Sequence, residues 1–140
     1  ESAPLIVAKR HQIGNTVDAC NDCGQCDPWC PEDGGPYLVK PNLFVSPLAW
    51  SDHPEKDGFH LEPETGDLLW RRGGQVLRYR QLDPGSARLQ TAQGSLMLQD
   101  DVPVSADGQG TLELRDVLTM RLFRESWTDP DVVTWLPRLS

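Results

Sequence analysis

The chain has 140 residues, enough for one ordinary domain or two small modules, and a net charge of −8. This acidic balance argues against nucleic acid and anionic membrane surfaces as partners, since both are bound mainly by Lys and Arg. No run of 18 apolar residues occurs, so we expect no membrane insertion and a cytoplasmic location. With 38% hydrophobic residues, 12 Pro and 12 Gly, we expect a modest core that needs a cofactor or a partner.

The N-terminal stretch offers only one short apolar patch, Pro4–Ala8, which is too short and mixed for a secretory signal. The chain begins with Glu1 rather than Met, and a Met followed by Glu is not normally trimmed. We therefore expect this start to be a cut or renumbered end of a longer polypeptide.

All four cysteines lie in the stretch ACNDCGQCDPWCP. Their spacing, C-x2-C-x2-C-x3-C followed by Pro31, is typical of bacterial [4Fe–4S] ferredoxins, whose short loops turn each thiolate inward. Gly24 lets the backbone approach the cluster, and Trp29 is placed to exclude water from it. The sequence therefore predicts that a [4Fe–4S] cluster is held by Cys20, Cys23, Cys26 and Cys30.

Two other kinds of cysteine site are weaker alternatives. Structural zinc usually pairs two C-x2-C knuckles across a spacer of a dozen or more residues, whereas here all four ligands crowd together. Disulfides between such close cysteines would be strained, and the chain shows no secretion signal. A structural zinc- or cluster-stabilised interaction module without a redox role is thus the alternative function.

The number of clusters is left open by the motif. In two-cluster ferredoxins the fourth cysteine of this run binds the other cluster. Either all four cysteines bind one cluster, or Cys30 joins a cluster shared with an upstream segment or another subunit, which fits the unusual N-terminus better. His11, His53 and His60 are spare candidate ligands, although a loop histidine is more often simply solvated.

Residues 20–44, CNDCGQCDPWCPEDGGPYLVKPNLF, resemble the C-terminal iron–sulfur segment of the selenate reductase-type family. The departures are mild, with Asp22 where the family has Glu and Trp29 where it has Phe. Trp50 and Ser51, followed later by the pair Gly58 and Phe59, also resemble a spaced pattern of the family in which a bulky aromatic residue precedes a Gly-Phe pair. The matching positions are Cys20, Asn21, Cys23, Gly24, Cys26, Cys30, Pro31, Gly34, Pro36, Tyr37, Lys40, Leu43 and Phe44.

Members of that family are long flavin- and NAD(P)-linked proteins with a core like the glutamate synthase small subunit, and they accompany molybdenum hydroxylases. Their upstream cysteine-rich motif and their flavin and NAD(P) domains do not occur in this sequence. The resemblance therefore implies an electron-transfer module of a larger oxidoreductase, with other subunits or upstream domains as partners and no substrate-converting site of its own. A free ferredoxin is disfavoured by the large extension that follows the cysteines.

From residue 58 onward the pattern predicts short antiparallel strands. Between residues 76 and 81, Leu77 and Tyr79 alternate with Arg78 and Arg80, so one face should be buried and the other wet. We expect four or five strands, with one hairpin around Gly73–Gly74 and another around Gln93–Gly94. The predicted strands are Gly58–Glu62, Asp67–Arg72, Gln75–Gln81, Arg88–Ala92 and Leu96–Gln99.

After residue 110 the apolar spacing becomes helical, at Leu112, Val117, Leu118, Leu122 and Phe123. Asp129 and Pro130 resemble an N-cap and first helical residue, and predict a last short helix through Trp135. The expected fold class is α+β. Residues 1–48 would form a ferredoxin-like iron–sulfur segment, and residues 49–140 a small antiparallel β-rich domain with a C-terminal helix.

Two groups of charges stand out. Arg71, Arg72, Arg78 and Arg80 would form either a solvated hairpin face or a docking patch for an acidic partner. The acids around the cysteines should disfavour cluster reduction and predict a low potential. These acids are Asp18, Asp22, Asp27, Glu32 and Asp33.

Overall fold

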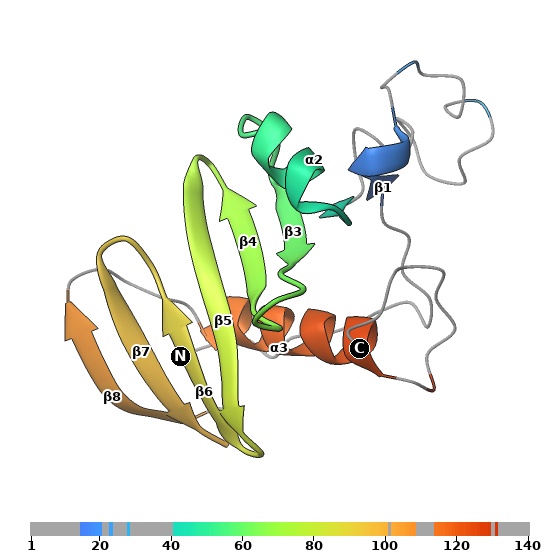
Figure 1. The fold of residues 1–140 in the computed structure, drawn as a ribbon. Coiled ribbons are helices and arrows are strands. Elements are labelled where there is room, and N and C mark those ends of the chain that lie inside the picture. The colour runs from blue at the N-terminus through green and yellow to red at the C-terminus, as the bar shows by residue number, and fades with distance from the viewer. Residues whose placement is uncertain are drawn as a thin grey trace.

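The computed structural model describes residues 15–20, 23, 28, 41–100, 102–108, 114–129 and 131. Within them, eight strands form one sheet in which the spatial order equals the sequence order (Figure 1). The first three strands run parallel to one another, and every later neighbour is antiparallel. The strands are β1 (Asn15–Thr16), β2 (Asn42–Phe44), β3 (Gly58–Leu61), β4 (Leu68–Arg72), β5 (Gln75–Asp83), β6 (Ser86–Gln90), β7 (Gly94–Gln99) and β8 (Val102–Gly108).

The hairpin between β4 and β5 confirms the prediction made from Gly73–Gly74. Both glycines have positive φ, 58° and 81°, as the two central residues of a primed turn require. Leu77 and Tyr79 are buried and the intervening Arg78 is only partly covered, as the period of two predicts.

The sheet is larger than the predicted four or five strands. The paired parts of β1 and β2 span two and three residues, too short to show a period. β8 is exposed along its whole length, so its residues show no apolar alternation. The predicted hairpin around Gln93–Gly94 is present, but its strands begin two residues earlier than predicted.

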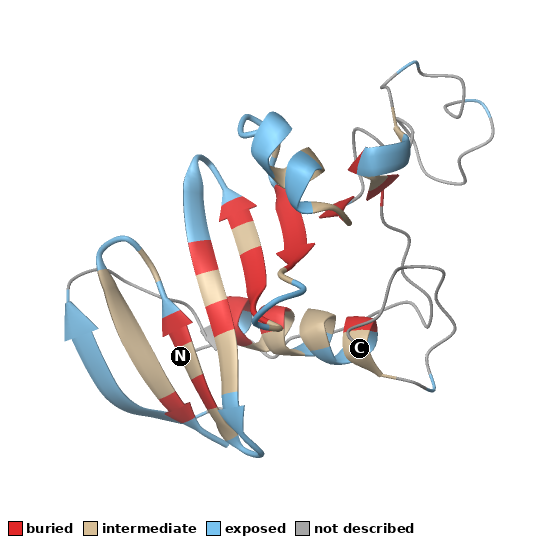
Figure 2. Ribbon diagram, viewed as in Figure 1, coloured by how far each residue is buried: buried red, intermediate tan, exposed pale blue. Residues whose placement is uncertain are grey.

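The core lies between one face of the sheet and the helix α3 (Leu114–Thr128), which confirms the C-terminal helix (Figure 2). Val117, Met120 and Trp127 are buried against the sheet, whereas Leu122 is 37% exposed. Phe123 stacks on Phe59 of β3, with ring centroids 4.1 Å apart. The helix is thereby held across the middle strands.

Two shorter helices lie near β1 and β2. The 3-10 helix η1 (Val17–Ala19) leads into the cysteine segment, and α2 (Pro47–Asp52) follows β2. Ser46 caps α2 by accepting a hydrogen bond from Ala49 N at 3.0 Å, and Pro47 occupies the first turn, where a missing N–H is harmless.

The architecture therefore confirms a mixed α+β chain in which a sheet is followed by a C-terminal helix. The predicted boundary between residues 48 and 49 falls inside α2, and the division into two domains stays a prediction. The predicted helix from Pro130 to Trp135 lies outside the described residues, although the Asp129 carboxylate accepts a hydrogen bond from Asp131 N at 2.8 Å, as an N-cap does. No helix among the described residues is long and apolar enough to cross a membrane.

Candidate iron–sulfur site

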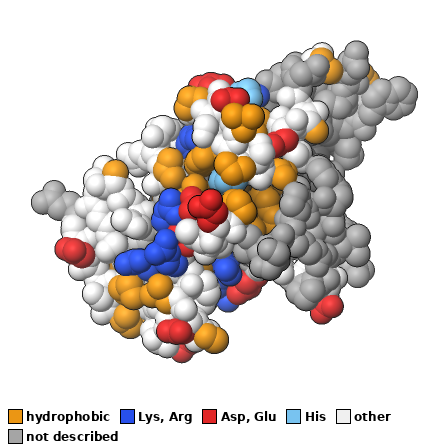
Figure 3. Space-filling model, in the orientation of Figure 1, with side chains coloured by type: hydrophobic (Ala, Val, Ile, Leu, Met, Phe, Trp, Pro, Cys, Tyr) orange, Lys and Arg blue, Asp and Glu red, His pale blue; other side chains and the backbone are white. Residues whose placement is uncertain are grey.

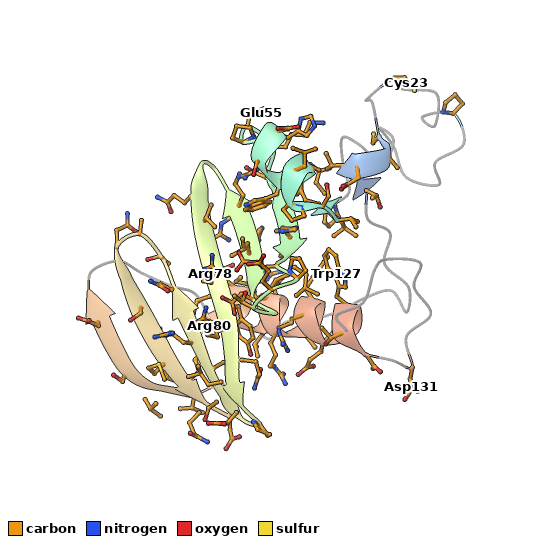
Figure 4. The ribbon with its side chains drawn as sticks, viewed as in Figure 1. Cys23, Glu55, Arg78, Arg80, Trp127 and Asp131 are labelled. Carbon is orange, nitrogen blue, oxygen red and sulfur yellow. The ribbon has the colours of Figure 1, made fainter. Side chains whose placement is uncertain are left out.

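The structure describes two of the four predicted ligands. Cys20 directly follows η1 and is half-buried, and its N–H donates to Val17 O at 3.1 Å. Cys23 is exposed and lies beyond β1, away from Arg78 and Arg80 (Figure 4). Cys26 and Cys30 lie outside the described residues, as do Gly24, Trp29 and Pro31.

The described residues alone do not assemble a metal site. Among them, no three His, Cys, Asp or Glu side chains lie close enough together to hold a metal ion. Because half of the predicted cysteine set lies outside the described residues, the four-cysteine site stays a prediction.

The two ends of the cysteine-bearing segment are held side by side. β1 precedes the cysteines and β2 follows them, and these two strands pair in parallel, with Thr16 opposite Leu43. Asn15 N donates to Pro41 O at 2.8 Å, and Asn15 Nδ2 donates to Asn42 Oδ1 at 3.0 Å. The described ends of this segment, at Thr16 and Pro41, therefore lie at one place on the sheet.

Asp18 forms a second connection at this base. Its Oδ2 accepts from Val45 N at 2.7 Å, and its Oδ1 accepts from Ser46 N at 2.9 Å. Burial alone would raise the pKa of Asp18, but the hydrogen bonds from Ser46 and Val45 outweigh it and lower the pKa below its usual value. An ionised Asp18 thus connects η1, two residues before Cys20, to the start of α2.

α2 is itself fixed by a stack of three side chains. The Arg71 guanidinium lies 3.7 Å from the Trp50 ring, and His60 stacks on Trp50 with a centroid distance of 5.6 Å. Arg71 also donates to Trp50 O at 2.9 Å and His53 O at 2.7 Å, which are carbonyls at the end of α2. These contacts join α2 to β3 and β4, and so support the base of the cysteine segment.

The histidines that were considered as spare ligands have other surroundings. His60 is buried, and its Nδ1 lies 2.7 Å from Phe44 O. His53 ends α2, with Nδ1 3.6 Å from Glu55 Oε1. His11 lies outside the described residues. Neither described histidine belongs to a group of three or more metal-ligating side chains among the residues that the structure describes.

The four arginines have different surroundings, and the choice between a solvated face and a docking patch stays a prediction. Arg71 is buried on backbone carbonyls, and Arg72 forms a double hydrogen bond to Asp116 of α3, at 3.0 and 2.8 Å. Arg78 and Arg80 share the carboxylate of Asp67. These four arginines mainly hold the elements of the fold together, because each has partners that a solvated face would not supply.

Of the acids near the cysteines, only Asp18 is described, and it acts as a clamp rather than as free charge. From the sequence, Asp18 was expected only to add negative charge near the cysteines. The pair Ser46–Pro47 was a usable signal, because Ser followed by Pro marks the start of a helix and hence the place that Asp18 contacts.

Two surface hollows of about 210 and 250 Å³ lie elsewhere on the molecule. The first is lined by residues of β5 to β7 and α3, including Tyr79 and Glu125, and the second by the ends of the β4–β5 and β6–β7 hairpins and by β8. Neither hollow is lined by Cys20 or Cys23, the two predicted ligands that the structure describes.

No protein-family model matches the chain, and no curated protein or solved structure matches it either. The resemblance carried by residues 20–44 therefore stays a prediction, and the cysteine spacing is the strongest functional signal.

Proposed function

We propose that the chain is an electron-transfer module that carries a [4Fe–4S] cluster on Cys20, Cys23, Cys26 and Cys30. The observation that carries the proposal is the spacing C-x2-C-x2-C-x3-C-P, which places four thiolates within eleven residues. Such a donor set fits a cubane cluster better than zinc, whose ligand pairs are usually far apart in sequence. When bound, the cluster supplies one-electron transfer without making or breaking substrate bonds.

The arrangement of the described residues supports this proposal. A segment that binds a cofactor needs its ends fixed, and here the β1–β2 pair and the Asp18 clamp fix both ends. Cys23 is exposed, so a thiolate at this position is accessible both to a cluster and to a redox partner. The described residues thus hold the two ends of the segment in which the proposed ligands lie.

We place this module within a larger cytoplasmic oxidoreductase of the flavin- and NAD(P)-linked kind, associated with a molybdenum hydroxylase. This part of the proposal rests on the resemblance of residues 20–44. The acidic surroundings favour a potential in the lower half of the range of about −700 to +450 mV known for such clusters, although backbone N–H groups act in the opposite direction. A midpoint well above zero would contradict this.

The test is anaerobic purification of the full chain, followed by iron and acid-labile sulfide determination. We expect about four iron and four sulfide per chain, and a broad absorption band near about 400 nm that dithionite bleaches. A colourless protein with one zinc would support the structural alternative instead. Cysteines paired with one another, without metal, would contradict both.

A second measurement distinguishes one cluster from a shared pair. Cys23→Ser should abolish or convert the cluster in either arrangement. Cys30→Ser should do the same only if all four cysteines bind one cluster, and should leave this cluster largely intact if Cys30 serves another. Ser51→Ala, on α2, is the control that should leave the iron content unchanged.

A further inference from the structure

The outer strand β8 forms one edge of the described sheet and is open to solvent (Figure 2). Each of its seven residues is exposed, and the apolar residues Val102 and Val104 are 59% and 63% exposed. β1, at the other edge, has only two residues. β8 is therefore the longer of the two edges that the described strands offer to a further strand.

Side-chain charge does little to protect this edge. Natural sheets often carry Lys or other charged residues on an edge strand, which oppose pairing with another chain. The only charged residue of β8 is Asp107, one residue from its end. In the space-filling view, the basic side chains gather over the middle of the sheet and not along β8 (Figure 3). Any protection of this edge therefore has to come from its backbone.

Pro103 interrupts the row of backbone donors on β8. It is the second residue of the strand and lies opposite Leu98 of β7. Proline has no N–H, and within a sheet it occupies edge strands with its nitrogen facing solvent, strand starts or bulges. Pro103 is itself exposed, so it does not fill the core. A strand added outside β8 would lack a hydrogen-bond donor at this position.

A β-bulge directly follows this proline. Ser105 lies opposite Met97 and Pro103 lies opposite Leu98, so Val104 has no partner residue on β7. An extra residue of this kind bends the strand, increases its twist and interrupts the ladder. An added strand would thus meet a missing donor and a bulge at consecutive residues, in the half of β8 that carries the exposed valines.

We propose that Pro103 and the bulge at Val104 keep β8 from pairing with an edge strand of another molecule, and in the first place with β8 of a second copy. Two identical strands can pair antiparallel about a twofold axis. No charge between Val102 and Ala106 would repel the second copy, and the exposed valines would supply apolar contacts. This inference does not depend on the cluster, because every residue in it belongs to β7 or β8.

The test is sedimentation velocity of the full chain from micromolar to millimolar concentration, with the iron content of all samples matched. Pro103→Thr restores the backbone N–H with a residue that favours strands, and deletion of Val104 removes the bulge. We expect each change to strengthen self-association about tenfold or more over wild type, because each restored backbone hydrogen bond occurs twice in a symmetric pair. The combined variant should associate most strongly, and its β8 amides should exchange with solvent more slowly than those of wild type.

Two control variants locate the effect. Pro63→Thr makes the same substitution in an exposed turn and should leave self-association unchanged. Val102→Lys, added to Pro103→Thr, places a positive charge on the edge strand and should return self-association to the wild-type level.

The proposal is overturned if Pro103→Thr associates no more strongly than wild type while its circular dichroism and unfolding free energy show that it is folded. This variant alone decides the test if the chain without Val104 does not fold. Equal association of Pro63→Thr and Pro103→Thr, or association that persists after Val102→Lys, would also overturn it, because the contact would then lie outside β8.

Discussion

The Asp67 carboxylate accepts hydrogen bonds from two nitrogens of Arg80, at 3.0 Å from Nε and 2.8 Å from Nη2, although Asp67 itself is only 1% exposed. The same carboxylate accepts from Arg78 at 2.7 Å. A buried carboxylate is tolerated only when its charge is paired and its oxygens are hydrogen-bonded, and both conditions hold here. Asp67 thereby joins the start of β4 to the middle of β5.

Removing this charge should destabilise the fold. Asp67→Asn leaves the two guanidinium groups without their shared anion, and we expect a loss of about 2 kcal/mol, less than is usual for a broken buried pair because both arginines are partly solvated. Urea denaturation measures the free energy of unfolding. Asp83→Asn, at the exposed end of β5, is the matched control and should change the free energy of unfolding little. Equal losses in the two variants would contradict the role of Asp67.

Stability should also depend on pH through Asp67. Burial alone would raise its pKa, but hydrogen bonds from Arg80 and Arg78 outweigh this and lower the pKa below its usual 3.8. A depressed pKa in the folded state contributes stability that is complete above the unfolded-state value and is lost as the pH falls through the folded one. Between pH 5 and pH 3, roughly, the wild type should lose stability more steeply than Asp67→Asn. Parallel plots of unfolding free energy against pH for the two proteins would contradict this prediction.

Arg71 should not be replaceable by lysine. Its planar guanidinium stacks on Trp50 while donating to carbonyls of α2 and the following turn, a combination that an ammonium group cannot reproduce. We expect Arg71→Lys to cost about 2 kcal/mol. Faster hydrogen exchange should be confined to α2 and the turn after it. Arg115→Lys, on the exposed surface of α3, should be neutral.

The Asp18 clamp should govern the order of the segment that follows it. Asp18→Ala removes two hydrogen bonds, and we expect about 1 kcal/mol of destabilisation, limited by the exposure of this carboxylate. The amides of Val45 and Ser46 should exchange faster, and the loaded protein should lose iron sooner. Asp52→Ala, on the exposed side of α2, is the control. Unchanged exchange at Val45 and Ser46 would show that the clamp does not form.

Gly58 should tolerate no side chain, because β2 packs closely against it. An added Cβ would lie 2.5 Å from Asn42 O and 2.8 Å from Phe44 Cε2. We expect Gly58→Ala to cost about 3 kcal/mol by separating β2 from β3. Gly73→Ala is the matched control, since an added Cβ there meets nothing within 4 Å and costs only about 1 kcal/mol of backbone strain at φ 58°. Equal losses of stability in the two variants would indicate that backbone strain, and not packing, determines both losses.

Local features of the sequence determined part of this protein directly. Paired glycines at 73 and 74 predict a primed turn because few other residues adopt positive φ, and the alternation around Leu77 and Tyr79 predicts a half-buried strand because side chains on a strand alternate between faces. The spacing of the four cysteines predicts a cluster-binding site in the same way, because neighbouring residues alone set the distances between the thiolates.

Tertiary structure decided which distant groups meet. β1 and β2 pair across the cysteine segment, and Arg71, which reads as surface charge, is buried on the carbonyls of α2. A strand of two or three residues is too short to show an apolar–polar alternation. The identity of a charged residue does not indicate which group it will pair with. Such pairings form because burial requires every charge and backbone group to be satisfied, and only the assembled sheet supplies the groups that satisfy them.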